Sequence, residues 1–98
     1  MFKEEEVNGL ILNVVPMRFK NEGKEDSVMT CITYALPATS SDRFKGFAIL
    51  RGYANADAFN KLDNVVKSNM LAKIKIETRP TESGSKFYIN SVNGIACR

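Results

Sequence analysis

The sequence predicts one small, mainly β domain with five strands and a single helix between the third and the fourth strand. Three observations lead to this prediction. The chain has 98 residues, which is enough for one domain with one hydrophobic core. In several segments hydrophobic and polar residues alternate, as they do in strands with one buried face. This alternation gives way to a helical spacing in one segment, residues 55–70.

The first part of the chain is typical of two strands joined by a turn. Residues 7–20 are rich in β-branched side chains, and Gly9 and Pro16 interrupt them. A long, bent strand is the simplest account of this segment. The turn that follows contains Gly23, which can take a positive φ. Residues 26–36 alternate again, so we expect them to pair with the first strand as a hairpin.

A third strand and the helix occupy the middle of the chain. A loop over residues 37–42 leads to a strand that we expect at residues 44–53. Between residues 55 and 70 the hydrophobic side chains fall at positions i, i+1, i+4, i+7 and i+8, which is the stripe of an amphipathic helix. Asn55 is expected to cap this helix at its N-terminus. Phe59 lies on the stripe and is assigned to the core.

Two further strands complete the predicted domain. Residues 71–80 alternate cleanly and predict a half-buried strand with a charged outer face. After a turn, residues 86–92 form the last strand, and residues 95–97 can add a short edge. The order β-β-β-α-β-β is the connectivity of the OB-fold, a small and partly open Greek-key barrel. An open α+β sheet with the helix packed on one face is the alternative.

The charges are unevenly distributed along this single domain of residues 1–98. The formal net charge is +3, from 14 lysine and arginine residues and 11 acids. Residues 1–6 hold three of the acids and one base, so residues 7–98 carry 13 bases and 8 acids, a balance of +5. The sequence leaves open whether the acidic start is ordered. Such an excess of bases fits a polyanionic partner, and it also fits an ordinary solvated surface.

The chain offers little for catalysis. It contains no histidine, which removes the usual general base and the commonest metal ligand. Cys31 and Cys97 therefore lack the usual activating partner, and we expect them to be reduced thiols in a cytoplasmic protein. No segment resembles a signal peptide or is long enough to span a membrane. The sequence therefore predicts a non-catalytic protein that has no cofactor or metal and does not enter a membrane.

The C-terminal third carries a resemblance to a known family. Residues 65–77, Val-Val-Lys-Ser-Asn-Met-Leu-Ala-Lys-Ile-Lys-Ile-Glu, resemble the helix end, turn and fourth strand of bacterial and phage single-stranded DNA-binding proteins. Residues 79–92 are similar to that family's hairpin of strands 4 and 5, and residues 8–15 loosely resemble its first strand. The family's acidic recruiting tail and its tryptophan platform have no counterpart here, so the chain resembles a compact phage, plasmid or accessory member. The resemblance implies an OB-fold that binds single-stranded DNA in replication or recombination.

Binding of a single strand requires cationic side chains for the phosphates and aromatic faces for the bases. The sequence interleaves the two types at residues 18–20, 43–53 and 86–88. In an OB-fold the binding face is centred on strands 2 and 3 and flanked by the loops that join strands 1–2 and 4–5. We therefore predict a sequence-tolerant interface for single-stranded nucleic acid, and we expect DNA. Its candidate residues are Arg18, Phe19, Lys20, Lys24, Tyr34, Lys45, Phe47, Arg51, Tyr53, Lys73, Lys75, Arg79, Lys86 and Tyr88.

Several of these residues also have a plainer interpretation. A domain of this size needs aromatic side chains for its core, and Phe44 and Phe87 are assigned there, while Phe19, Tyr34, Phe47 and Tyr53 fit either place. We expect a homo-oligomer, a dimer or a tetramer, because linked copies bind a long strand with greater avidity. The alternative function is a small β-barrel module for protein–protein interaction or for structure in a phage or mobile element.

Overall fold

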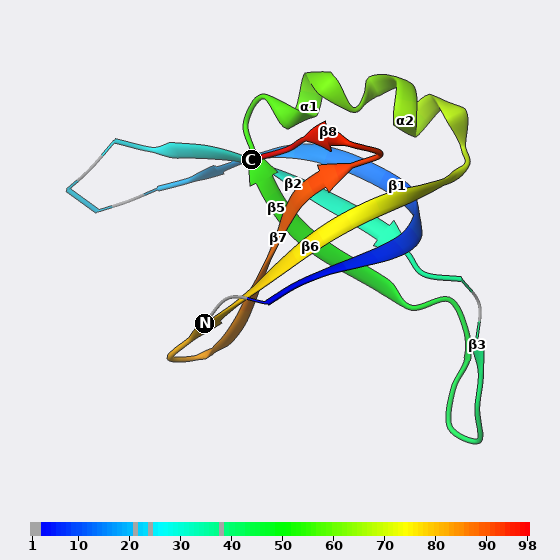
Figure 1. The fold of residues 1–98 in the computed structure, drawn as a ribbon. Helices are drawn as coiled ribbons and strands as arrows, with labels where there is room; N and C mark the ends of the chain where they lie inside the picture. Colours follow the sequence, from blue (N-terminus) through cyan, green and yellow to red (C-terminus); the bar gives the residue numbers. More distant parts are fainter. Residues whose placement is uncertain (1–2, 21, 24, 38) are drawn as a thin grey trace.

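The computed structural model of the chain describes residues 3–20, 22–23, 25–37 and 39–98. It is mainly β, with a short helical segment in the second half of the chain (Figure 1). The strands are β1 (Lys3–Phe19), β2 (Ser27–Ala35), β3 (Thr39–Ser40), β4 (Lys45–Gly46), β5 (Ile49–Asn55), β6 (Leu71–Thr81), β7 (Gly84–Val92) and β8 (Ile95–Ala96). The helices are α1 (Ala58–Lys61) and α2 (Asp63–Ser68). Among the described residues, neither helix has the length and apolar character needed to cross a lipid bilayer.

The five long strands are joined in a ring. The sheet has the order β5-β2-β1-β6-β7-β8. A parallel pairing of Tyr53 in β5 with Tyr88 in β7 joins the first strand of this order to the fifth and so closes the ring. We call β1, β2, β5, β6 and β7 the ring. β1 serves two partners, because residues 3–10 pair with β6 and residues 10–19 pair with β2. The prediction of a long first strand is confirmed, although β1 begins four residues earlier than expected.

Two contacts of its acidic residues support the early start of β1, one at Glu6 and one at Glu4. Glu6 lies opposite Lys75 in the register of β1 and β6, so charges of opposite sign face each other across the strands. Asn90 Nδ2 donates a hydrogen bond of 2.6 Å to Glu4 Oε2. The acidic start from residue 3 onward therefore forms part of the sheet.

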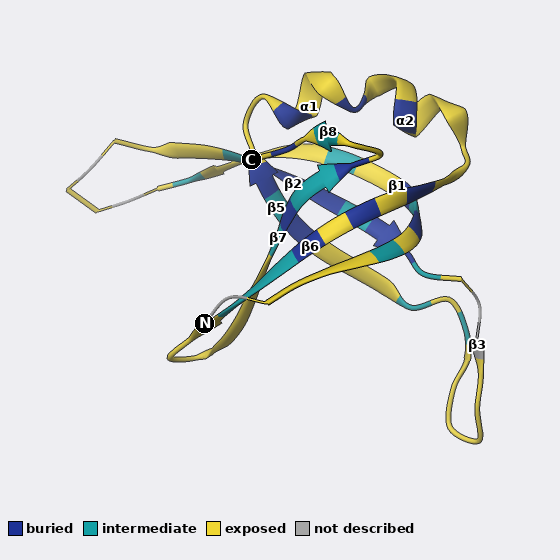
Figure 2. Ribbon diagram, in the orientation of Figure 1, coloured by how far each residue is buried: buried dark blue, intermediate teal, exposed yellow. Residues whose placement is uncertain are grey.

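The hydrophobic core lies inside the ring and beneath the helices, which lie across one end of the strands (Figure 1). In Figure 2 the buried residues gather in the middle of the strands and on the side of α1 and α2 that faces them. The alternation predicted for β6 is confirmed, because its inward residues are buried and its lysines are exposed. The buried core consists of Ile11, Ile32, Tyr34, Ala54, Ala58, Leu62, Val65, Ala72, Ile74, Ile76, Ile89, Val92 and Cys97.

The helical segment differs from the single helix predicted over residues 55–70. Asn55 is the last residue of β5, and the N-cap position of α1 is Asp57, whose side chain makes no capping hydrogen bond. The two short helices meet at Leu62, where the backbone leaves the helical region (φ −97°, ψ 8°). Phe59 is 43% exposed, so its assignment to the core was wrong. The residues that face the core follow the spacing i, i+4, i+7 from Ala58, which leaves Phe59 at the edge of the stripe.

The third predicted strand also differs. It was expected over residues 44–53, but β5 begins at Ile49, and the preceding residues belong to a small hairpin of β3 and β4 that projects from the ring (Figure 1). The turn of this hairpin is closed by Ser41, whose N–H donates to the Phe44 carbonyl at 2.7 Å and whose Oγ accepts from the Phe44 N–H at 3.1 Å. Gly46 takes φ +127°, which an L side chain rarely adopts. Because the hairpin projects, Phe44 is 47% exposed and does not lie in the core as predicted.

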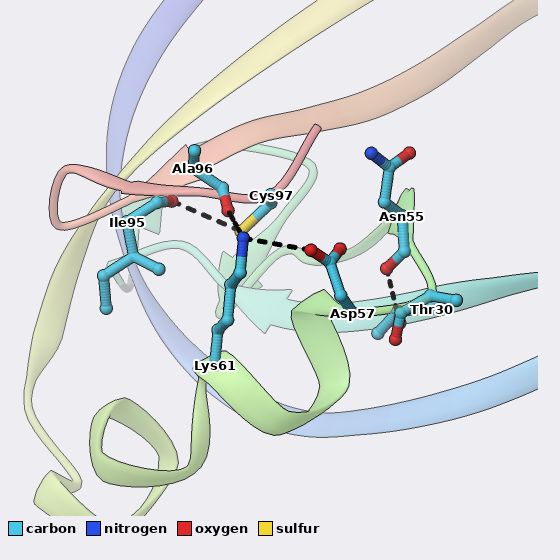
Figure 3. Close-up of polar contacts among 8 residues, drawn as sticks. Thr30, Asn55, Asp57, Lys61, Ile95, Ala96 and Cys97 are labelled. Atoms are coloured by element: carbon cyan, nitrogen blue, oxygen red, sulfur yellow. Dashed lines mark hydrogen bonds and ion pairs between the residues drawn. The ribbon is translucent and has the colours of Figure 1, made fainter.

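Polar contacts fix the first helix to the ends of the strands (Figure 3). Thr30 Oγ1 donates a hydrogen bond of 2.8 Å to the Asn55 carbonyl at the end of β5. Lys61 Nζ lies 3.1 Å from the Asp57 carboxylate and donates to the Ala96 carbonyl at 3.3 Å. The helix and the short edge strand β8 are therefore held together at this end of the ring.

Both cysteines are buried, and Cys97 belongs to the core. Cys31 and Cys97 are both buried and free. Burial raises the pKa of the Cys97 thiol, and the nearby charge of Lys61 offsets only part of this effect. At neutral pH the thiol is therefore protonated, which suits a packing residue better than a nucleophile.

Candidate nucleic-acid interface

Three of the predicted aromatic residues come together on the outside of the ring. Phe19 ends β1, Tyr53 lies near the end of β5 and Tyr88 lies in the middle of β7. The rings of Phe19 and Tyr53 meet edge to face, with centroids 6.0 Å apart and an interplanar angle of 70°. Tyr53 and Tyr88 are register partners where β5 and β7 meet. We call Phe19, Tyr53 and Tyr88 the aromatic cluster.

The aromatic cluster borders an open cavity of about 320 Å³. Ser27 and Met29 of β2 and Lys86 of β7 complete its walls. The three rings are half-buried, while Lys86 is exposed. Arg51 is also exposed and lies on the same side of β5 as Tyr53, two residues before it. Flat apolar faces and cationic groups therefore lie side by side, which is the combination that a single-stranded nucleic acid requires.

Two guanidinium groups lie against the Tyr88 ring. The Cζ atoms of Arg79 and Arg98 are 4.6 Å and 4.5 Å from the ring centroid, within the range of a cation–π contact. Both arginines also contact Glu77: Arg79 Nε donates to Glu77 Oε2, and Arg98 Nη1 lies 3.3 Å from the same oxygen. The hydrogen bond from Arg79 is the main cause of a lowered pKa at Glu77. Glu77 is therefore ionised at neutral pH and holds both cations beside the ring.

Arg98 and Met29 were missed by the sequence analysis. Arg98 reaches Tyr88 because β8 pairs with β7 just before the end of the chain. Met29 reaches the cavity because it lies on the outward side of β2. The local sequence does not indicate that either residue lies at this site, because its place there depends on which strands become neighbours.

Tyr34 does not belong to this interface, so its predicted stacking role is wrong. It is 2% exposed and packs in the core, on the same face of β2 as Thr30 and Ile32. Burial raises the pKa of its hydroxyl, and the charge of Glu5 adds to this effect. The assignment of Phe87 is wrong in the opposite sense. It was expected in the core, but it is 44% exposed.

The remaining candidate residues are spread over other surfaces. Lys45 lies in the projecting hairpin and Phe47 directly after it, both outside β5, and neither borders the cavity of the aromatic cluster. Lys73 and Lys75 are exposed on β6 and face β1 partners Asn8 and Glu6, away from the walls of the cavity. Arg18 is exposed and alternates with Phe19, so it points to the opposite side of β1. Lys20 is exposed just after β1, and Lys24 lies outside the described residues.

A second surface is almost entirely apolar. An open cavity of about 360 Å³ lies between the start of β5, the end of β2 and the start of β6. Phe47 and Ile49 are each 63% exposed there, and Leu71 is 59% exposed. We call this surface the apolar groove. Its lining residues are Leu10, Leu12, Ala35, Leu36, Pro37, Phe47, Ile49, Asn69 and Leu71, none of which carries a charge.

Comparison with known proteins adds no family to this description. No protein-family model, no curated protein and no solved structure matches the chain. The geometry and chemistry of the surfaces above are therefore the evidence for function.

Proposed function

We propose that the chain is a non-catalytic, cytoplasmic protein that binds single-stranded DNA through the aromatic cluster. The observation that carries this proposal is the convergence of three rings from three strands around one cavity with Lys86. Each ring that stacks on a base contributes about 1–3 kcal/mol whatever the base. Lys86 and Arg51 lie where they can contact phosphates. Because neither stacking nor phosphate contacts depend on the identity of the base, the binding is sequence-tolerant. A role in replication or recombination follows from the family that the C-terminal third resembles.

The strand topology supports an OB-fold as the scaffold of this interface. Five long strands are joined in a ring, and the helical segment lies between the third and the fourth of them, β5 and β6. An OB-fold is a partly open barrel of five strands that binds oligonucleotides on one face and with adjacent loops. Phe19 lies beside the connection of the first two strands, and Lys86 lies beside the turn between the last two. The aromatic cluster therefore lies between the two loops that such a fold uses.

Fluorescence anisotropy with a labelled oligo-dT tests the proposal. We count about three phosphate contacts, one each from Lys86 and Arg51 and one from the arginine pair, whose two charges share the carboxylate of Glu77. They predict a slope of log affinity against log salt of about −2. The affinity is therefore expected to fall roughly 20-fold between about 50 and 200 mM salt. No binding at roughly tens of micromolar protein in low salt, where even non-specific binding is measurable, would contradict the proposal.

A second surface favours self-association. The apolar groove is free of charge in a chain of which 26% is charged, and contiguous exposed apolar surface of this kind marks interaction sites. We propose that its occupant is a second copy of this chain. A two-fold contact must be self-complementary, and a wholly uncharged groove meets this condition because no like charges would face each other when two copies of it meet. Two linked copies would also bind a long DNA strand with greater avidity.

Leu71→Asp is expected to dissociate this dimer, because the substitution places a charge in the contact. Sedimentation velocity should show dimers for the unchanged protein and monomers for the variant, with the same circular dichroism spectrum. Val28→Asp is the matched control, since Val28 is a 45% exposed strand residue outside the groove. A monomeric unchanged protein, or equal dissociation by both variants, would rule out the groove as the contact.

A further inference from the structure

A third cavity, of about 380 Å³, opens where β5 and β7 separate. Among the described residues these strands are joined at one pair, Tyr53 and Tyr88, and the start of β5 has no strand partner on that side. Neither helix contributes to the walls. We call this cavity the seam pocket. Its lining residues are Glu5, Tyr34, Ile49, Leu50, Arg51, Ile76 and Phe87.

The carboxylate of Glu5 lies on the core side of β1. Glu5 is the register partner of Ile76, and residues directly opposite each other on antiparallel strands point to the same face. Ile76 is 4% exposed and belongs to the core, so Glu5 points toward the interior at the mouth of the ring. Glu4 and Glu6, its neighbours, point outward. The charge of Glu5 acts on the Tyr34 hydroxyl, which agrees with this placement.

The walls of the seam pocket suit a flat, mostly apolar ring. Leu50 and Phe87 are 42% and 44% exposed, and with Ile76 they leave apolar faces open to a ligand. The volume lies near the lower end of the range of about 300–1,000 Å³ for small-molecule sites. The polar side chains of the walls are Arg51, the Tyr34 hydroxyl and the carboxylate of Glu5, which offers two acceptor oxygens when ionised.

The seam pocket adjoins the aromatic cluster. Arg51 and Tyr53 lie on the same side of β5, whereas Phe87 and Tyr88 are consecutive on β7 and point to opposite sides of it. A DNA strand whose bases stack on the aromatic cluster would pass Arg51 and turn through the gap between β5 and β7 to place its next base in the seam pocket. Arg51, at the rim, would then lie beside the phosphate of that nucleotide.

A carboxylate distinguishes bases by the donors on their pairing edge. Guanine offers two adjacent donors, N1–H and the N2 amino group, which can pair with both carboxylate oxygens. Thymine offers one N–H between two acceptors, and cytosine and adenine each offer an amino group beside an acceptor. We propose, on the basis of the proposed function, that the seam pocket binds a guanine base of single-stranded DNA, with Glu5 accepting both hydrogen bonds and Phe87 against the ring. The protein then combines sequence-tolerant stacking with a preference at one nucleotide.

Anisotropy titrations with two oligonucleotides test the seam pocket. One is oligo-dT, and the other is the same oligonucleotide with a single central dG, which cannot form a quadruplex. The protein is expected to bind the second about tenfold more tightly, within the range for a bidentate base contact. A central inosine, which lacks the N2 amino group, should lose much of this gain. Glu5→Gln should bind the two oligonucleotides equally, because its amide presents a donor to the guanine donors.

Glu6→Gln is the matched control, because it removes the same charge from the same strand but from its outer side. It should keep the tenfold preference, and both variants should change the oligo-dT affinity to a similar extent. Tight oligo-dT binding without a guanine preference in the unchanged protein would overturn the seam pocket and leave the proposed function intact. A preference that survives Glu5→Gln would overturn the role of Glu5, and no binding to either oligonucleotide would overturn both proposals.

Discussion

Gly52→Ala is expected to lower the free energy of unfolding by roughly 1–3 kcal/mol, the range for an overpacked core. A Cβ at Gly52 would lie 2.5 Å from Cδ1 and 2.7 Å from Cγ1 of Ile89. Ile89 is fully buried, so its side chain cannot move aside without displacing other core residues. In a domain of this size the loss corresponds to a fall of roughly 5–20 °C in melting temperature. Urea denaturation followed by circular dichroism measures it.

Two further variants show whether the contact with Ile89 is the cause. Gly9→Ala should lose less stability, because the nearest atom to its added Cβ is Ile74 Cδ1 at 3.1 Å, which needs a much smaller shift than the 2.5 Å contact at Gly52. Adding Ile89→Val to Gly52→Ala removes Cδ1 and should recover part of the loss, which gives a favourable coupling in a double-mutant cycle. A loss at Gly52 no greater than at Gly9, or a coupling of zero, would show that the close approach of β5 to β7 does not limit stability.

Tyr88→Ala is expected to weaken the binding of oligo-dT roughly 10- to 100-fold, as the loss of one stacked base does. Tyr88 is the ring on which Arg79 and Arg98 lie, so the substitution removes a stacking face and also the support of two cations. Tyr88→Phe keeps the ring and should bind almost normally. Anisotropy at low salt measures the affinities, and thermal unfolding checks that each variant is folded.

Phe59→Ala is the control for a general loss of aromatic surface. Phe59 is 43% exposed, similar to other surface aromatics, but it lies on α1 and does not border the cavity of the aromatic cluster. Its substitution should leave the oligo-dT affinity unchanged. If Phe59→Ala and Tyr88→Ala weaken binding equally, the aromatic cluster is not the DNA-binding surface.

The strands with clean alternation were predictable because their signal is local. In β6 the three buried residues are Ala72, Ile74 and Ile76, and the charged residues that alternate with them are Lys73, Lys75 and Glu77. The two-residue period therefore identifies both the strand and its buried face. In β2 both faces carry hydrophobic side chains, and the neighbours β1 and β5 decide which face is inside. This is why the predicted strand was confirmed while the role assigned to Tyr34 was wrong.

The candidate site was predictable as a set of residue types and not as an arrangement. Phe19, Tyr53, Lys86 and Tyr88 were all selected from the interleaving of aromatic and basic residues, and the structure places them around one cavity. Their proximity depends on the contact of β5 with β7, which joins distant segments of the chain. The hairpin of β3 and β4 separates residues that were expected to lie together. Because it replaces the start of the predicted third strand, Phe47 lies outside β5, the strand that carries Tyr53.

The divided pairing of β1 has a consequence during synthesis of the chain. Its second half pairs with β2, which follows directly, but its first half pairs with β6, which leaves the ribosome much later. In the interval residues 3–8 are an open edge to which the same segment of another nascent chain could add. Glu4, Glu5 and Glu6 place three negative charges on that edge, so two copies repel each other. We therefore expect the acidic start to disfavour pairing between copies until β6 has been made.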